Sequence, residues 1–422
     1  MLTSHLLSRK TMTAEILLAI MLALVVANFL LDTTLDYLND RSARFTAEPR
    51  IPEFYDETEY KRSTAYSHEK YRFGLFDSSI NVVVTVLALI FGWFAILDNF
   101  VRDYFNNDLI ISLGFIALLG FISSVVNLPF GLYFTFKLEA KYGFNKTTIK
   151  TFITDRIKGT LLSIAIGGPL LAAVIFIYQQ IPQWFWLIGW ALVSAFSLLS
   201  FMFGTKLFLP LFNKLQPVPD GELRDEIEKY CKSQGYAMSK LYVMDGSRRS
   251  TKANAFFSGM GKTKTIVLFD TLIEKLTTPQ ITAVLAHEIG HYKRKHTLAM
   301  FLLSNLQTFA LFALLGWLLG NPILSEALGA SVPSFHIGIL AFFLLFSPIS
   351  LILGIIDNAL SRRNEFEADK FALDTYPNSS EHLRDALKKI STDSLANLTP
   401  HPWYVKVHYT HPPILQRLAK LS

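Results

Sequence analysis

Long apolar runs alternate with polar stretches along the whole chain. Each run has about the 17–25 residues that a helix needs to cross a hydrocarbon core, or slightly more if the helix is tilted. The pattern predicts a mostly α-helical, polytopic membrane protein with seven transmembrane helices. The predicted spans are Ile16–Leu31, Ile80–Leu97, Leu109–Phe136, Leu161–Tyr178, Trp184–Leu209, Leu298–Leu319 and Ile337–Leu360.

Two of these spans have features of their own. The first follows Arg9 and Lys10, as the apolar run of a signal peptide would, but no clear small-x-small cleavage site follows it. We therefore predict a retained span. The third contains Asn127 and Pro129, which predict a kink with the amide facing protein or water rather than lipid.

The polar stretches predict the parts outside the bilayer. Residues 33–78 carry both charge signs and are expected to be partly helical. Residues 208–297 and 361–422 contain no repeats or low-complexity linkers, so we expect them to form one unit with a small β hairpin or sheet. Its predicted elements are a helix at Glu222–Ser233, strands at Leu241–Met244, Ala253–Phe257 and Thr265–Phe269, a turn at Gly259–Gly261, and helices over TTPQITAVLAHEIGHYKRKHT and EHLRDALKKI. The chain thus divides into spans one to five (1–207), a soluble segment (208–297), spans six and seven (298–360) and a C-terminal segment (361–422).

Composition supports this class of protein. Of the 422 residues, 51% are hydrophobic and only 18% are charged, which is too apolar for a water-soluble chain of this size. The net charge of +6 belongs to loops that flank the spans, so no nucleic-acid partner is expected. The single cysteine, Cys231, excludes an internal disulfide and a cysteine-type zinc cluster.

The distribution of basic residues predicts the orientation. With seven spans, the N-terminus and the loops after spans two, four and six share one side, which carries only Arg9, Lys10 and Arg102 of the 40 Lys and Arg residues. The positive-inside rule therefore places residues 208–297 and the C-terminus in the cytoplasm, and the N-terminus on the opposite side. The membrane would be a bacterial inner membrane or the endoplasmic reticulum.

The sequence His287-Glu288-Ile289-Gly290-His291 is the strongest chemical signal in the chain. It lies in an expected helix, with Thr278 as N-cap and Pro279 in the first helical position. Two histidines four residues apart project from one helical face, so both imidazoles can reach a single metal ion. Glu288 lies beside them, where it can take a proton from water.

Catalytic zinc sites of this type use a third protein ligand and keep one position open. Glu365 and Asp369, four residues apart beyond the seventh span, share a helical face. Glu365 lies about 7–8 Å of helix past that span, and His291 about 10 Å before the sixth, on the same predicted side. We therefore predict Glu365 as the third ligand and Asp369 as the acceptor of a hydrogen bond from a ligand imidazole.

Two nearby polar residues are not expected to join the site. Glu367 lies about 200° round the helix from Glu365, so we expect it to face solvent. His296, nine positions after His287, is expected on the opposite face of the motif helix and is predicted not to be a ligand. Without the motif, Glu365 and Asp369 alone would indicate a solvated acidic face that forms ion pairs with the neighbouring Arg362 and Arg363.

These residues together resemble a known family. HEIGH, the downstream SRRNEFEAD, the upstream NAFFSG and the late THPP are similar to the motifs of type I CAAX prenyl endopeptidases, which are integral-membrane zinc metalloproteases. The resemblance covers nearly the whole chain, including the seven spans and the place of HEIGH between the fifth and sixth. It departs at Glu367, where glutamine is frequent in the family.

The resemblance implies a gluzincin-type zinc site in a protein whose spans enclose a large water-filled chamber. One Zn²⁺ per chain is then the cofactor, with His287, His291 and Glu365 as ligands and Glu288 as general base. Asp369 is implied to contact a ligand and not the metal ion.

The same family motifs imply two residues directed at the substrate. Asn254, in NAFFSG, is implied to contact substrate, and His411, in THPP, to stabilise the transition state by a hydrogen bond to the oxyanion. The strand at 253–257 is expected to present an unpaired edge to an extended peptide, and a plain hairpin is the alternative. Expected partners are membrane lipids and peptide or protein substrates, among them lipidated C-terminal tails, because eukaryotic members cut the last three residues from farnesylated CAAX tails.

Other interpretations stay open at this point. A membrane quality-control protease of the heat-shock type shares HExxH and the downstream glutamate, although fewer spans are typical there. A site-2-type intramembrane protease is disfavoured, since Lys293, Arg294 and Lys295 follow the motif at once. A transporter or scaffold with a structural zinc would need a fourth protein ligand, and none is evident in the sequence.

Overall fold

Seven long apolar helices make up most of the molecule. The computed structural model describes residues 2–45, 55–236, 240–258 and 265–422, and seven helices there are long and apolar enough to cross a membrane, as predicted. The spans are formed by α1 (Leu2–Phe45), α2 (Glu57–Ile90), α4 (Asp108–Tyr133) with the π-helix η1 (Phe134–Glu139), α5 (Ile149–Leu162) with the π-helix η2 (Ser163–Gly167) and α6 (Gly168–Gln180), α7 (Phe185–Phe212), α11 (His296–Leu318) and α13 (Phe335–Thr375).

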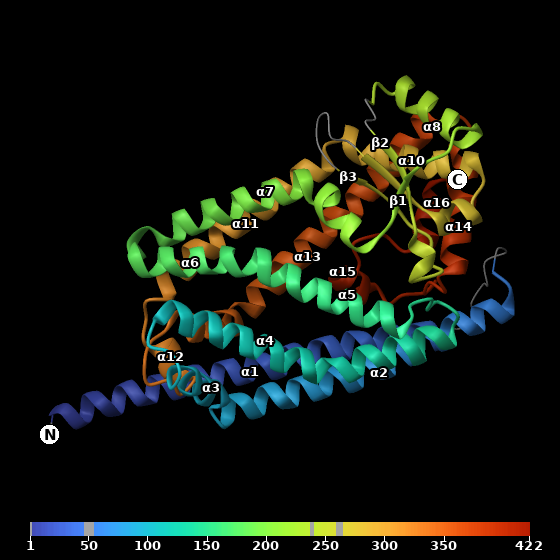
Figure 1. Ribbon diagram of the computed structural model, residues 1–422. Coiled ribbons are helices and arrows are strands. Elements are labelled where there is room, and N and C mark those ends of the chain that lie inside the picture. The colour runs from blue at the N-terminus through green and yellow to red at the C-terminus, as the bar shows by residue number, and fades with distance from the viewer. Residues whose placement is uncertain (1, 46–54, 237–239, 259–264) are drawn as a thin grey trace.

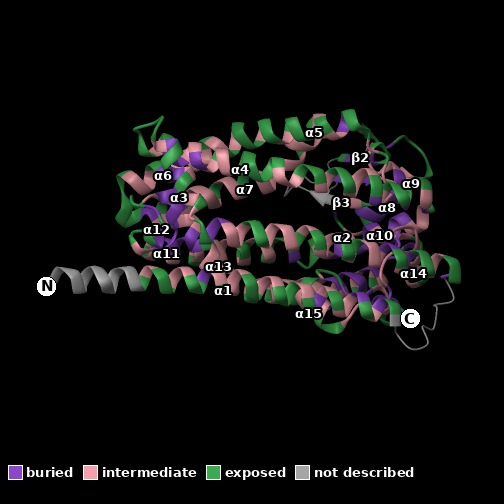
Figure 2. Ribbon diagram, turned by 90° about the horizontal axis from the view of Figure 1, so that it is seen from below, coloured by how far each residue is buried: buried purple, intermediate pink, exposed green. Residues whose placement is uncertain are grey.

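The spans form a ring (Figure 1). α1 packs against α2 and α13, α4 against α6, α6 against α7, and α7 against α11, which returns to α13; η1 closes the ring by contacting α2. Buried residues gather at the two ends of the molecule (Figure 2), and at most 17% of the apolar window of any span is buried. Such a ring is what an enclosed chamber requires, and the chamber itself stays a prediction.

The second span is shifted from its predicted position. We expected Ile80–Leu97, whereas α2 begins at Glu57 and ends at Ile90. Gly92 then adopts a left-handed φ of 63°, which costs glycine little, and the chain restarts as the short helix α3 (Trp93–Arg102). The polar stretch expected to be partly helical is largely so in its described part, because it extends α1 to Phe45 and forms the start of α2.

Three spans contain a proline in the helix interior, namely Pro129 in α4, Pro210 in α7 and Pro348 in α13. Pro129 lies inside α4, as predicted, and the Asn127 amide donates to the Ser123 carbonyl oxygen at 2.9 Å. In α13, Pro348 cannot donate to the carbonyl of Leu344, and the hydroxyl of Ser347 donates to that oxygen instead at 3.0 Å. α13 therefore continues as one helix of 41 residues.

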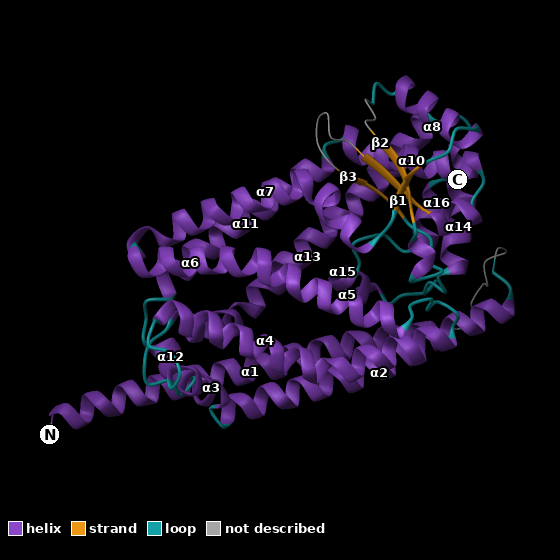
Figure 3. Ribbon diagram, in the orientation of Figure 1, coloured by secondary structure: helices purple, strands orange, loops and turns teal. Residues whose placement is uncertain are grey.

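The strands of the described residues lie at one end of the molecule (Figure 3). β1 (Leu215–Pro217), β2 (Lys240–Met244), β3 (Ala255–Ser258) and β4 (Thr265–Phe269) form a sheet of order β1-β2-β4-β3, in which β2 and β4 are parallel and the other pairs antiparallel. The predicted strands are confirmed to within two residues, and β3 is an edge strand among the described residues. The predicted turn at 259–261 lies outside the described residues.

The sheet and the helices around it enclose one apolar core, which includes Ile227, Ile266, Leu285 and Leu383. α8 (Glu222–Ser233) matches its prediction. α10 (Thr278–Lys293) has Thr277 as its N-cap, one residue before the predicted Thr278, and the Thr277 backbone N–H donates to Gln280 Oε1 at 3.1 Å. The other helices are η3 (Pro182–Trp184), η4 (Gly246–Arg248), α9 (Asp270–Lys275), α12 (Ile323–Ala327), α14 (Ser379–Asp393), α15 (Pro402–His408) and α16 (Ile414–Lys420).

α10 and α13 approach each other closely at Gly290. A Cβ atom on this residue would lie 3.1 Å from the Cα and the carbonyl oxygen of Ala368 and 3.0 Å from Phe371 Cβ. Ala368 is fully buried, so its backbone has little room to move. The glycine of HEIGH therefore sets the spacing between the helix of the motif and the helix that continues from the seventh span.

Gly290→Ala is expected to lower the stability of the metal-free protein by about 1–3 kcal/mol, because the added methyl has to displace the backbone of α13. The midpoint of thermal unfolding in detergent measures the change. Gly354→Ala, in α13 itself, is the matched control, since a Cβ there meets no atom within 4 Å. An unchanged midpoint for Gly290→Ala would contradict the close approach.

Candidate metal centre

α10 presents both histidines of the motif toward α13. The Nε2 atoms of His287 and His291 lie 3.2 Å apart, because residues four apart share one face of a helix. His287 is buried and His291 is half-buried. Two imidazole nitrogens are thus held together at the boundary between the soluble unit and the ring of spans.

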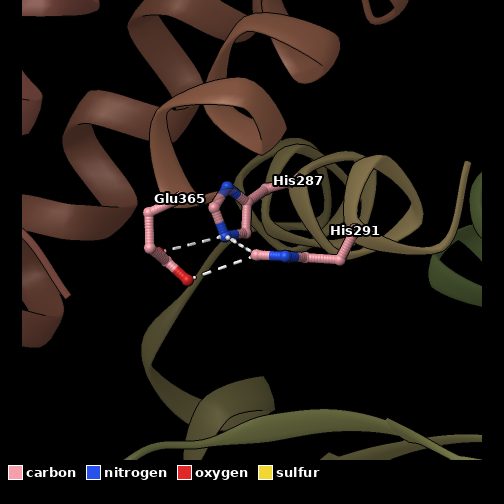
Figure 4. A group of neighbouring side chains, drawn as sticks. All are labelled: His287, His291 and Glu365. Atoms are coloured by element: carbon pink, nitrogen blue, oxygen red, sulfur yellow. Dashed lines mark hydrogen bonds and ion pairs between the residues drawn. The ribbon is translucent and has the colours of Figure 1, made fainter. Parts of the chain in front are cut away.

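Glu365 brings a carboxylate to the same point from α13. Its Oε1 lies 3.3 Å from His291 Nε2, and its Oε2 lies 3.5 Å from His287 Nε2. Figure 4 shows the three side chains converging, the two rings from one helix and the carboxylate from the other. The structure therefore brings together all three predicted ligands as a group that can hold a metal ion.

The distances within this group fit a tetrahedral zinc ion. Zinc bonds of about 2.0–2.2 Å to imidazole nitrogen and carboxylate oxygen place neighbouring donor atoms about 3.3–3.6 Å apart. The two Nε2 atoms are 3.2 Å apart, and each has its own Glu365 oxygen, at 3.3 Å from His291 and 3.5 Å from His287. Glu365 Oε2 is also buried without a hydrogen-bond partner in the described part of the chain. A bound cation would give this oxygen a ligand bond in place of the missing hydrogen bond.

Asp369 and Arg417 support the group from behind. Asp369, one turn after Glu365, places Oδ1 2.8 Å from His287 Nδ1. Arg417 donates from Nε and Nη2 to the two Asp369 oxygens at 2.9 and 2.6 Å, and its Nη1 lies 3.2 Å from Glu365 Oε2. Burial acts to lower the pKa of Arg417, but the Asp369 and Glu365 carboxylates outweigh it, so the pKa is raised.

Sequence reasoning did not find Arg417. The residue lies in α16, close to the C-terminus, and only the folding of this short helix against α13 and α14 brings its guanidinium to the site. No local spacing relates it to the motif. A lone arginine in a polar tail is normally solvent-exposed, so the sequence offered no signal for it.

The His287 imidazole has a raised pKa in the metal-free protein. Burial acts to lower it, but the Asp369 and Glu365 carboxylates outweigh burial and raise the pKa of His287 to about 9. At neutral pH the ring is therefore protonated. Because a metal ion binds only the neutral imidazole, it has to displace this proton.

The prediction for His296 was wrong in its placement. We expected the residue on the opposite face of one continuous helix, but α10 ends at Lys293 and Lys295 adopts a left-handed φ of 59°. His296 therefore begins α11 and is buried with its Nδ1 3.2 Å from His291 Nδ1. Its Nε2 lies 3.1 Å from Glu367 Oε2. Glu367, which we expected to face solvent, is therefore in contact with His296 and only half-exposed.

The remaining predicted residues have different relations to the group. Glu288 is half-buried on α10, directly after His287. His411 follows α15, with Nε2 3.3 Å from Glu365 Oε1 and 64% of its side chain exposed. Asn254 precedes β3, where its Oδ1 accepts a hydrogen bond from the Ala255 N–H at 2.8 Å. No hydrogen bond or ion pair among the described residues joins Asn254 to the three donor groups.

The motif helix carries two histidines and a glutamate, and a second helix adds a carboxylate as the third donor group. Together with the ring of seven apolar helices, this site defines an integral, multi-pass membrane metalloendopeptidase. Comparison with known families agrees. Residues 41–214 match the family described as CAAX prenyl protease N-terminal, five membrane helices, and residues 217–422 match peptidase family M48. This chain belongs to the CAAX prenyl protease 1 family of M48 peptidases.

Relatives span nearly the whole chain. A CAAX prenyl protease 1 homolog of Oryza sativa subsp. japonica is 34% identical over 95% of this chain and 96% of its own length. CAAX prenyl protease 1 of Saccharomyces cerevisiae is 33% identical, covering 92% and 91%. The crystal structure of S. mikatae Ste24p is similar with a TM-score of 0.91 and 31% identity, covering 96% of this chain and 99% of that one.

These comparisons confirm the predicted family, fold class and metallopeptidase activity. A family of M48 peptidases implies a metal cofactor, for which the group of His287, His291 and Glu365 is suited. A non-proteolytic transporter or scaffold is not supported.

Metal affinity of the metal-free protein is expected to rise about tenfold per pH unit between pH 7 and 9 and then to level off, because each ion displaces one proton from His287. The same raised pKa stabilises the metal-free fold fully below the ordinary value of 6.5, and this contribution is lost as the pH rises through about 9. Competition with a chromophoric chelator at several pH values measures the affinity. An affinity that does not change over this range would contradict the protonated His287.

Proposed function

We propose that this chain is a zinc-dependent endopeptidase that cleaves CAAX-type, prenylated tails near their C-terminus on the cytoplasmic side of its membrane. One observation carries the proposal: His287, His291 and Glu365 bring two imidazole nitrogens and a carboxylate together as a group that can hold a metal ion, and Glu288 directly follows His287 on α10. Relatives named CAAX prenyl protease 1, similar over most of the chain, support the substrate class.

The chain's own residues divide the work of hydrolysis. Zinc held by this group supplies a Lewis acid that lowers the pKa of water and polarises a carbonyl oxygen. Glu288 takes the proton from the attacking water and delivers it to the leaving amine. Asp369 accepts the hydrogen on His287 Nδ1, which keeps Nε2 of that ring free to bind the metal ion.

Substrate contacts are assigned to two further places. His411 is mostly exposed, beside Glu365, where its Nε2 can donate a hydrogen bond to the oxyanion of the transition state. The edge of β3 offers backbone groups to an extended peptide, which would add to the sheet as a strand. Asn254, at the start of this strand, then contacts the peptide with its side chain.

The orientation rests on charge and on the positions of the two termini. The N-terminus lies at one end of the ring and the soluble unit with the C-terminus at the other (Figure 1). All but three of the 40 basic residues belong to the side of the soluble unit in the sequence order of seven spans. The positive-inside rule supports a cytoplasmic site.

Glu288→Gln is expected to lower kcat by about 10²–10⁴-fold while zinc content stays at one ion per chain, because the amide cannot accept a proton. Glu365→Ala, in contrast, is expected to lose the zinc. Activity assays and elemental analysis of the purified variants test both, with Glu381→Gln, an exposed carboxylate on α14, as the control. Strong turnover by Glu288→Gln would exclude it as the base.

A farnesylated CAAX peptide is expected to be cleaved with at least a tenfold higher kcat/KM than the same peptide without the lipid. Burial of only two methylene groups contributes about 1.6 kcal/mol, and tenfold needs about 1.4 kcal/mol. Mass spectrometry of the fragments should show release of the last three residues. Equal cleavage of both peptides and of casein would instead favour a protease of broad specificity, such as the quality-control type.

A further inference from the structure

Each ligand imidazole needs a partner for the nitrogen that does not bind metal. Both rings direct Nε2 toward Glu365, so the hydrogen of each neutral ring has to sit on Nδ1. His287 has Asp369 for this purpose, with Oδ1 at 2.8 Å. His291 Nδ1 faces no carboxylate but the Nδ1 atom of another imidazole, that of His296, at 3.2 Å.

The hydrogens in this pair have one arrangement that satisfies both rings. His291 Nδ1–H donates to the bare Nδ1 of His296, and His296 therefore carries its own hydrogen on Nε2. That nitrogen lies 3.1 Å from Glu367 Oε2, a carboxylate that accepts it. A chain of two hydrogen bonds thus runs from the ligand imidazole through His296 to Glu367.

The backbone is built to place His296 there. On a continuous helix, residues five apart differ by about 140° in direction, which would turn His296 away from His291. Lys295 has a left-handed φ of 59°, and this residue ends the helical path. The left-handed conformation is unfavourable for an L residue with a long side chain. α11 then starts with His296 folded back against His291, and only 8% of its side chain is exposed.

We propose that His296, oriented by Glu367, is a positioning residue that fixes the tautomer and ring orientation of His291 so that Nε2 faces the metal ion. The inference rests on the proposed zinc site and adds a residue from the sixth span to its support. His296 contacts neither metal nor substrate. Partners of this kind change metal affinity by about 10–100-fold when they are removed.

Two substitutions at one position separate this role from simple packing. His296→Leu keeps the volume but removes the acceptor, so we expect zinc to be lost to an excess of EDTA about 10–100-fold faster than from the wild type. His296→Asn can place Oδ1 where Nδ1 lies and accept the same hydrogen bond, so loss within about threefold of wild type is expected. The visible spectrum of the cobalt-substituted proteins should change for leucine and be retained for asparagine.

A third variant changes the other end of the hydrogen-bond chain. Glu367→Ala leaves His296 in place but removes its acceptor, and it should also speed zinc loss. Arg363→Ala is the control, because it removes only the exposed ion pair to Glu367 at 2.9 Å and such pairs contribute little. Unfolding midpoints of the metal-free variants identify any that fail to fold.

The outcomes distinguish this inference from the function on which it rests. Slow zinc loss from His296→Leu and faster loss from His296→Asn would indicate packing alone and overturn the positioning role. A wild-type protein that binds no zinc and cleaves no peptide would instead overturn the proposed function. The expected order, with leucine fastest, then asparagine close to wild type, supports the inference.

Discussion

The contact of α10 with α13 is the constraint on which the site depends. One helix supplies two donor groups and the other supplies the third, so an error in the spacing of the helices appears directly in the distances between ligand atoms. Gly290 against Ala368 removes the side-chain layer that normally separates two helices. The apolar core of the soluble unit, with Ile289 and Ala372 buried on these helices, then holds them in this position. The geometry of the metal site is therefore a result of packing.

The charges around the site explain why it favours a cation. Glu365 and Asp369 are both buried, which is costly for two carboxylates. Arg417 compensates Asp369 through two parallel hydrogen bonds, the strongest form of such a pair. Glu365 Oε2 lies 3.2 Å from Arg417 Nη1 but has no hydrogen-bond partner in the described structure. In the metal-free protein the protonated His287 balances the remaining negative charge. A divalent ion that displaces this proton then provides the compensating positive charge.

The sequence allowed prediction of whatever depends on local spacing. The apolar runs, the pair His287 and His291, and the turn from Glu365 to Asp369 are periodic features of single helices, and the structure contains them. Features set by a break in the backbone were missed: the turn at Gly92 moved the second span, and the left-handed Lys295 returned His296 to the site. Arg417 was missed because its position depends on how the last helix folds back over the rest. Roles for Asn254 and His411 came from family resemblance, since nothing in their spacing indicates them.

The unbroken course of α13 has a mechanical consequence. About 25 Å of helix separates Pro348 from Glu365, and at Pro348 the backbone lacks one of its own hydrogen bonds, which the Ser347 hydroxyl replaces. A change of about 3° in the bend at this proline would swing the Glu365 carboxylate by about 1.3 Å, because the rod acts as a lever. The neighbours α1 and α11 thus have to hold that angle nearly constant. Bilayer thickness and lateral pressure, acting on these helices far from the chemistry, would reach the active site through it.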